Sequence, residues 1–156
     1  MYAIMLLVVD LMGEVVFVNG PRFGAVMIAV ISATRILLVK DKSFTDPRWK
    51  LPGGSVEAED TDITSAAIRE LGSETGLRLK RWRFTILTDE RRTEERYRPH
   101  LCVVRLTETK LDSHEPVGNE DGKQLEVRAF THAEVLAMTG ILTQHLDLIR
   151  EALASS

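Results

Sequence analysis

The sequence predicts an α/β protein, in which a mixed β-sheet carries helices packed against it. Short runs of branched apolar residues separated by turn residues fill the first part of the chain, as expected of strands. A helical apolar periodicity follows at residues 62–75 and returns near the C-terminal end, with further strand-like runs in between. Strands, a helix, strands and helices in this order are typical of a sheet covered by helices.

The bulk composition fits a single globular domain. The 156 residues include 44% hydrophobic and 28% charged side chains, and we expect one domain over residues 1–156. The apolar N-terminal stretch lacks a basic region and a small-residue cleavage site, and Asp10 and Glu14 interrupt it. We therefore expect neither a signal peptide nor a membrane contact. A single cysteine, Cys102 in an apolar run, adds to the expectation of a reduced, cytoplasmic setting.

The strands are expected where turn signals bound short apolar runs. Residues 1–20 contain two such runs and are expected to form an additional β-hairpin, which would extend the sheet or build a homodimer. The runs 25–32 and 35–40 are apolar on successive residues, as in strands covered on two faces. Further strands are expected at residues 82–89, 100–108 and 125–130, with a polar loop at 109–124.

The first helix is expected over residues 62–75, where Ile63, Ala67 and Leu71 form an apolar stripe. A polar residue at 60–62 can cap its start, and Gly76 suits the left-handed position after its end.

Two helices are expected in the last quarter of the chain. Thr131 and Glu134 form the pattern of a capping box, which opens a short helix that Gly140 ends. The last helix is expected to bury a stripe of Leu142, Leu146, Ile149 and Leu153. The four histidines are expected at the surface or at strand ends.

Two glutamates at the end of the first expected helix carry the functional signal. Glu70 and Glu74 are four residues apart and project from the same side of the helix. Like charges so placed cost roughly 0.2–0.5 kcal/mol, and the helix dipole disfavours an anion in the last turn. Such a pair is the usual provision for a hard divalent cation with oxygen ligands. The pair alone leaves open a solvated glutamate face beside Arg69.

The residues around this pair resemble the Nudix box, written G-x5-E-x7-R-E-U-x-E-E-x-G-U, where U is a bulky apolar residue. Gly54 matches the first glycine, residues 69–71 match R-E-U, and Glu74, Gly76 and Leu77 match the final E-x-G-U. The resemblance extends over most of the chain from about residue 24. It implies the Nudix fold, a mixed sheet sandwiched between helices (α/β/α), with the box at residues 53–77.

The box departs from the family pattern at three points. Asp60 stands where the pattern has glutamate, the loop after it is one residue longer, and Ser73 replaces the first glutamate of the E-E pair. Glu57 or Glu59 could take the place of Asp60 in bracing Arg69. Serine offers a neutral oxygen in place of a carboxylate, so that the metal site would have one anionic ligand fewer.

The resemblance implies Mg²⁺-dependent hydrolysis, with Mn²⁺ as an alternative, of the pyrophosphate linkage in a nucleoside diphosphate joined to another group. By the family pattern, Glu70 and Glu74 would bind the metal with the carbonyl oxygen of Gly53, and Arg69 would join the catalytic set. A nucleoside triphosphate is favoured by elimination, because subgroup signatures for ADP-ribose, dinucleoside polyphosphates and coenzyme A are missing.

A later acidic loop is expected to face the box. In relatives such a loop supplies a general base or a further metal ligand. Here Glu120 is the first candidate, followed by Asp121 in the same loop and Glu126 in the next strand. A plain solvated acidic loop is the alternative.

The stretch from Arg78 to Arg105 contains nine Lys or Arg against four Asp or Glu, which favours a basic wall for an anionic substrate. The candidates for substrate binding are Arg91, Arg92, Arg98 and Trp49. Surface ion pairs for the arginines and core packing for the tryptophan are the alternatives. An RNA 5′ end is a less favoured substrate, because it would require one continuous basic surface.

A second class of function stays open from the sequence. A degenerate Nudix domain would bind a nucleotide or partner without turning it over, and Ser73, Asp60 and the longer loop motivate this alternative. The substitution Ser73→Glu separates the two, because an enzyme weakened by a lost ligand should gain activity and a binding module should gain none.

Overall fold

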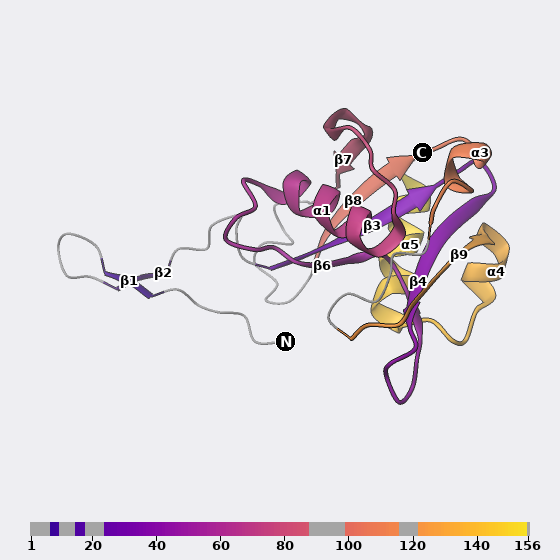
Figure 1. Ribbon diagram of the computed structural model, residues 1–156, viewed down its shortest axis with the longest axis horizontal. Coiled ribbons are helices and arrows are strands. Elements are labelled where there is room, and N and C mark those ends of the chain that lie inside the picture. Colours follow the sequence, from indigo (N-terminus) through magenta and orange to yellow (C-terminus); the bar gives the residue numbers. More distant parts are fainter. Residues whose placement is uncertain (1–6, 10–14, 18–23, 88–98, 116–121, 156) are drawn as a thin grey trace.

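The computed structural model describes residues 7–9, 15–17, 24–87, 99–115 and 122–155 (Figure 1). Its main sheet has seven strands, with β5-β4-β3-β8-β7 as the central path, β6 added to β3 and β9 added to β4. The strands are β3 (Ala25–Ile31), β4 (Arg35–Asp41), β5 (Trp49–Lys50), β6 (Gly53–Ser55), β7 (Phe84–Ile86), β8 (His100–Arg105) and β9 (Leu125–Thr131). The sheet is mixed, because β3 and β8 run parallel while the other pairs are antiparallel.

Two clusters of buried side chains cover the two faces of this sheet. Helix α1 (Ile63–Thr75) packs through Ala66 and Leu71 against residues of β3 and β8 on one face. Helix α5 (Thr143–Ala154) packs through Ile149 and Ala152 on the other face (Figure 1). Successive residues of β3 belong in turn to one cluster and then to the other, so that both faces of the strand are covered. This confirms the expected strand covered on two faces and the α/β/α arrangement.

Helix α1 begins and ends as its sequence predicts. The Asp62 side chain caps the start by accepting a hydrogen bond from the backbone N–H of Ser65 at 2.8 Å. Gly76 follows the end with φ 73°, in the left-handed conformation that favours glycine. These caps fix the position of the last helical turn, where Glu70 and Glu74 lie.

Three expectations about local structure are wrong. The described part of the strand expected at residues 82–89 begins in a 3-10 turn (Arg81–Arg83), and the strand itself is only the short β7, while residues 88 and 89 lie outside the described residues. The first residues of the expected loop 109–124 belong to a short helix, α3 (Glu108–Leu111). The Thr107 side chain caps this helix by accepting a hydrogen bond from the backbone N–H of Lys110. The capping box of α4 (His132–Ala137) is confirmed, but that helix ends before Gly140.

The buried face of α5 also differs from the expected stripe. The buried residues are His145, Leu148, Ile149 and Ala152, while Leu142 is 39% exposed. The whole helix is therefore rotated so that one histidine replaces a leucine in the core. Leucines at the margin of this face pack only in part.

The first strands lie apart from the main sheet. Strand β1 (Leu7–Val9) pairs antiparallel with β2 (Val15–Phe17), and the two form a sheet of their own (Figure 1). Among the described residues, neither strand joins an edge of the seven-stranded sheet. Within the same part of the chain, every helix is too short or too polar to span a bilayer. Cys102 is fully buried in β8, and burial raises the pKa of its thiol to about 12.

Candidate active site

The chain leaves β5 through Leu51 and Pro52 and enters β6 with two glycines, which lie against the end of α1; we call this entry the Gly53–Gly54 turn. Gly53 pairs with Met27 of β3, and its φ is 150°. A Cβ atom at Gly53 would lie 2.1 Å from the carbonyl oxygen of Val26, which is backbone and has no room to move. Only glycine allows the chain to pass this close to β3 and to present its backbone to the helix.

Glu74 lies beneath this turn and is 2% exposed. Its Oε2 accepts a hydrogen bond from the backbone N–H of Gly53 at 2.9 Å. Its Oε1 is buried and has no hydrogen-bond partner among the described residues, with Lys50 Nζ at 3.9 Å. Burial raises the pKa of Glu74, while the charges of Lys50 and Lys123 act in the opposite direction. A buried carboxylate oxygen without a donor is costly unless a cation satisfies it.

Glu70 is the second buried carboxylate and lies against Gly54. A Cβ atom at Gly54 would come within 2.7 Å of Glu70 Oε1, so that this glycine makes room for the carboxylate. Arg69 Nη1 binds the same oxygen at 2.7 Å. The charge of Glu70 also raises the pKa of Glu74, which indicates that the two carboxylates act on each other.

Arg69 is held in place by Asp60. Its Nε donates to Asp60 Oδ1 at 3.1 Å and its Nη2 donates to Oδ2 at 2.8 Å, while Nη2 also donates to the carbonyl oxygen of Ser55 at 2.9 Å. Glu57 approaches only to 3.5 Å and Glu59 is exposed. Asp60 itself therefore braces Arg69, and Glu57 adds only a longer ion pair without taking the place of Asp60.

Asp60 also closes the loop in which it lies. Asp60 is 6% exposed, and its carboxylate also accepts the backbone N–H of Glu57 at 2.8 Å, which closes the loop on itself. The hydrogen bonds from Arg69 are the main cause of the lowered pKa of Asp60.

The two glutamates can hold a divalent cation, although they form a small ligand set. The described part of the chain contains no group of three or more His, Cys, Asp or Glu side chains arranged for a metal. Ser73 Oγ donates to the carbonyl oxygen of Glu70 at 3.2 Å and adds no charge. Mg²⁺ commonly takes one or two carboxylates and completes its shell with waters and phosphates. The unpartnered Oε1 of Glu74 beside Glu70 meets that requirement.

His145 is a buried residue of this region, whereas the sequence analysis expected it at the surface or at a strand end. It is 7% exposed, and its Nδ1 accepts a hydrogen bond from the backbone N–H of Leu51 at 3.0 Å. It thereby ties α5 to the segment that leads into the Gly53–Gly54 turn. Its spacing of three and four residues from Leu148 and Ile149 was the signal that could have placed it in the core.

The stability of the protein should depend on the protonation of His145. Burial, followed by the charge of Lys50, lowers its pKa from 6.5 to about 4. The unfolded chain therefore takes up a proton first, so that the stabilisation is complete above pH 6.5 and is lost as the pH falls towards 4. We expect the free energy of unfolding to fall by about 3 kcal/mol over this interval. Denaturant unfolding at pH 7 and at pH 4.5 measures most of this difference.

The matched control for this measurement is His145→Asn, which keeps an acceptor near the position of Nδ1 but does not titrate. The difference between the two proteins isolates His145 from the other ionisable groups. Equal pH dependence in both would contradict the assignment.

The remaining predicted site residues fall into two groups. Trp49 is 8% exposed and packs edge-on against Phe130 at 4.8 Å, as the packing alternative predicts. Glu126 of β9 pairs with Lys40 at 3.5 Å. The others lie outside the described residues: Arg91, Arg92, Arg98, Glu120 and Asp121.

A family model and the solved structures that resemble this chain indicate the same family. The model of the NUDIX domain matches residues 21–151. A solved MutT structure from work on Aliivibrio salmonicida and Vibrio cholerae is 16% identical, covers 85% of this chain and 98% of its own, and gives a TM-score of 0.62. A comparison with curated protein sequences gave no match.

Two further solved structures contain nucleotide ligands. A bifunctional NMN adenylyltransferase/ADP-ribose pyrophosphatase from Francisella tularensis, complexed with AMP and a Mn ion, is 22% identical with a TM-score of 0.59 and covers 86% of this chain and 42% of its own. The NUDIX domain of Shewanella oneidensis NrtR, complexed with ADP-ribose, is 19% identical with a TM-score of 0.54 and covers 84% and 86%. At these identities the likeness shows the shared fold.

Proposed function

This chain belongs to the Nudix family as a pyrophosphohydrolase, and on that premise we propose that it hydrolyses a nucleoside diphosphate joined to a further group, in a Mg²⁺-dependent reaction. A nucleoside triphosphate is the favoured substrate. Enzymes of this family generally use divalent metal ions, and the solved Francisella tularensis relative contains Mn. We propose Mg²⁺ for this chain, with Mn²⁺ as its substitute.

One observation carries the proposal. Glu74 keeps a buried carboxylate oxygen with no hydrogen-bond partner among the described residues, next to Glu70 and below the Gly53–Gly54 turn. A helix selected only for stability would not place a second acid in its last turn, where the dipole opposes it. A divalent cation removes that penalty, which accounts for both acids at once.

We assign a role to each residue of the turn and the helix. Glu70 and Glu74 would hold the cation, with the carbonyl oxygen of Gly53 as a further ligand. Arg69 would keep Glu70 in position, because it binds that carboxylate at 2.7 Å while Asp60 fixes its other side. When bound, the cation supplies charge neutralisation at the phosphate oxygens and an activated water.

The residues outside the described part complete the proposal. Glu120 would act as the general base or a further ligand, ahead of Asp121. Lys123 supports this placement, because it follows the same loop and its charge lowers the pKa of Glu74. Arg91, Arg92 and Arg98 would bind phosphate groups. A single domain over residues 1–156, a homodimer through residues 1–20 and a cytoplasmic location also stay predictions.

The test is a substrate panel with and without metal. Phosphate or pyrophosphate release would be measured with Mg²⁺ and with Mn²⁺ on canonical and oxidised nucleoside triphosphates, ADP-ribose, dinucleoside polyphosphates and 5′-triphosphorylated RNA. We expect metal-dependent turnover, highest on a nucleoside triphosphate. Turnover that persists in excess EDTA would contradict the metal assignment, and turnover confined to ADP-ribose would contradict the substrate.

Restoring the family glutamate at Ser73 should strengthen metal binding. Ser73→Glu adds a third carboxylate beside Glu70 and Glu74, and affinity for a hard cation rises with ligand charge. We expect the dissociation constant for Mn²⁺, measured by calorimetry, to fall about tenfold. The free energy of unfolding without metal should fall by about 0.5–1 kcal/mol, because the added charge meets the helix dipole and its neighbours.

Ser73→Gln is the matched control, because it has the same length without the charge. It should leave Mn²⁺ affinity unchanged. If both substitutions tighten binding equally, side-chain length rather than charge is the cause.

A further inference from the structure

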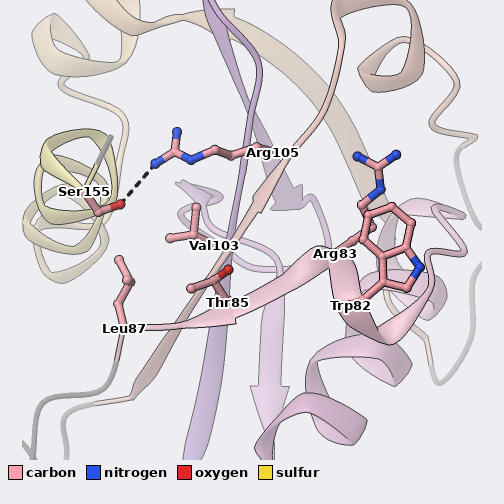
Figure 2. Close-up of a pocket in the computed structure, with 7 residues that line it drawn as sticks. All are labelled: Trp82, Arg83, Thr85, Leu87, Val103, Arg105 and Ser155. Carbon is pink, nitrogen blue, oxygen red and sulfur yellow. Dashed lines mark hydrogen bonds between the residues drawn. The ribbon is translucent and has the colours of Figure 1, made fainter.

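A cavity of about 330 Å³ has a lining that includes neither of the two carboxylates. It is lined by Trp82, Arg83, Thr85, Leu87, Val103, Arg105 and Ser155. Figure 2 shows Thr85 and Val103 between Trp82 and Arg83 on one side and Arg105 and Ser155 on the other. The cavity therefore opens over β7 and β8, next to the end of α5. We call it the β7–β8 groove.

The β7–β8 groove and the carboxylates lie on opposite faces of the sheet. Val103 belongs to the buried cluster on the α5 side, whereas Glu70 and Glu74 belong to α1. Along the parallel strands, Arg105 is level with Ile31, four residues beyond Met27, which pairs with Gly53. Four residues correspond to roughly 13 Å along a strand. A small molecule in the groove is therefore distinct from one that reacts at the carboxylates.

Two arginines of the groove have no carboxylate partner among the described residues. The Arg83 guanidinium lies over the Trp82 ring, and Arg105 donates to Ser155 Oγ at 3.1 Å. Nearby Arg81, in contrast, is neutralised by Asp62. Guanidinium groups without an acidic partner are suited to a phosphate, which they bind through paired N–H donors. The Thr85 hydroxyl adds a polar group to the lining, whereas the Ser155 hydroxyl already donates to the carbonyl oxygen of Ala152 at 2.7 Å.

Trp82 supplies a second kind of contact. Its side chain is 71% exposed, the most exposed of the large apolar side chains in the described part of the chain. The Arg83 guanidinium lies over the ring, 4.3 Å from the centroid. The guanidinium covers part of one face of the ring, and the remaining exposed indole surface can stack on an aromatic base.

We propose that the β7–β8 groove binds a nucleoside phosphate, with the base on Trp82 and the phosphate at Arg105. The inference does not depend on the proposed hydrolysis, because none of these residues belongs to the Glu70–Glu74 site. The ligand is either a free nucleotide or the 5′-phosphorylated end of a nucleic-acid strand, which carry the same two chemical groups.

The test uses the full chain in EDTA, which keeps metal-dependent binding and turnover out of the measurement. AMP, adenosine and inorganic phosphate would be titrated by calorimetry, together with a 5′-phosphorylated oligoadenylate. We expect AMP to bind at least about tenfold more tightly than adenosine or phosphate alone, because both halves of the groove take part. Equal affinity for AMP and the oligonucleotide identifies the free nucleotide as ligand, and tighter oligonucleotide binding identifies the strand.

Three substitutions locate the site. Arg105→Met and Trp82→Leu should each weaken AMP binding about tenfold, while Arg78→Met, an exposed arginine outside the groove, should not change it. All three side chains are exposed, so that folding is expected to persist and is checked by thermal unfolding. The proposal is overturned if the dissociation constant for AMP is above about 10 mM, which is weaker than a specific nucleotide site. It is also overturned if the groove variants bind AMP as well as the wild type. Loss of hydrolysis in Glu74→Gln with AMP binding intact would confirm that the two sites are separate.

Discussion

Glu74→Gln should abolish metal-dependent hydrolysis and leave the protein folded. We expect kcat/KM to fall by at least about 100-fold, since even partners that only orient a metal ligand cost 10- to 100-fold. The amide keeps the size of the side chain and can still accept the N–H of Gly53, which the carboxylate accepts at 2.9 Å. It loses the negative charge that would hold the cation.

The same substitution should not destabilise the protein in the absence of metal. Burial already raises the pKa of Glu74, so that the charged form is held in the fold at a cost. A neutral amide removes this cost, and we expect the free energy of unfolding in EDTA to stay equal or to rise by about 1 kcal/mol. Paired activity assays and denaturant curves measure both effects.

Glu59→Gln is the matched control for Glu74→Gln, because Glu59 is an exposed glutamate of the same box. It should change neither activity nor stability. Wild-type turnover in Glu74→Gln, or a large loss of stability in that variant, would contradict the assigned role of the buried carboxylate.

Gly53→Ala should unfold or severely destabilise the protein. The added Cβ would lie 2.1 Å from the backbone oxygen of Val26, at a φ of 150° that side chains rarely adopt. Backbone strain of this kind costs about 1–3 kcal/mol, and relieving the overlap would also part β6 from β3. We expect the free energy of unfolding to fall by about 3 kcal/mol or more, measured by urea denaturation.

Gly54→Ala is the neighbouring comparison, and its obstacle is of another kind. Its Cβ would meet the Glu70 carboxylate at 2.7 Å, which is the end of a side chain rather than backbone. We expect a loss of only about 1 kcal/mol in stability, together with a clear loss of metal affinity as Glu70 is displaced. If both glycine variants lose stability equally, the distinction between backbone and side-chain obstacles is wrong.

The sequence predicts those features that depend on local pattern. The limits of α1 follow from a capping aspartate and a C-terminal glycine, and the buried β3 follows from its uninterrupted apolar run. The position of Glu70 and Glu74 on one side of α1 follows from helix geometry alone. These features need no knowledge of the rest of the chain.

The features that the sequence analysis missed depend on distant partners. His145 enters the core because the N–H of Leu51, 94 residues away, needs an acceptor there. Asp60 braces Arg69 because a longer loop folds back on the helix, which counting along the motif does not reveal. The orphan oxygen of Glu74 likewise becomes visible only once its surroundings are known.

The pairing of β4 with β9 has a consequence for how the chain is made. Asp41 pairs with Leu125 and Arg35 with Thr131, so that 83 residues lie between the end of β4 and the start of β9. At synthesis rates of about 5–20 residues per second, β4 waits roughly 4–17 s for its partner. During that time an apolar strand presents an open edge to other nascent chains. The edge of β4 therefore stays open to other chains until residues 125–131 have been synthesised, and the sheet can close only after that point.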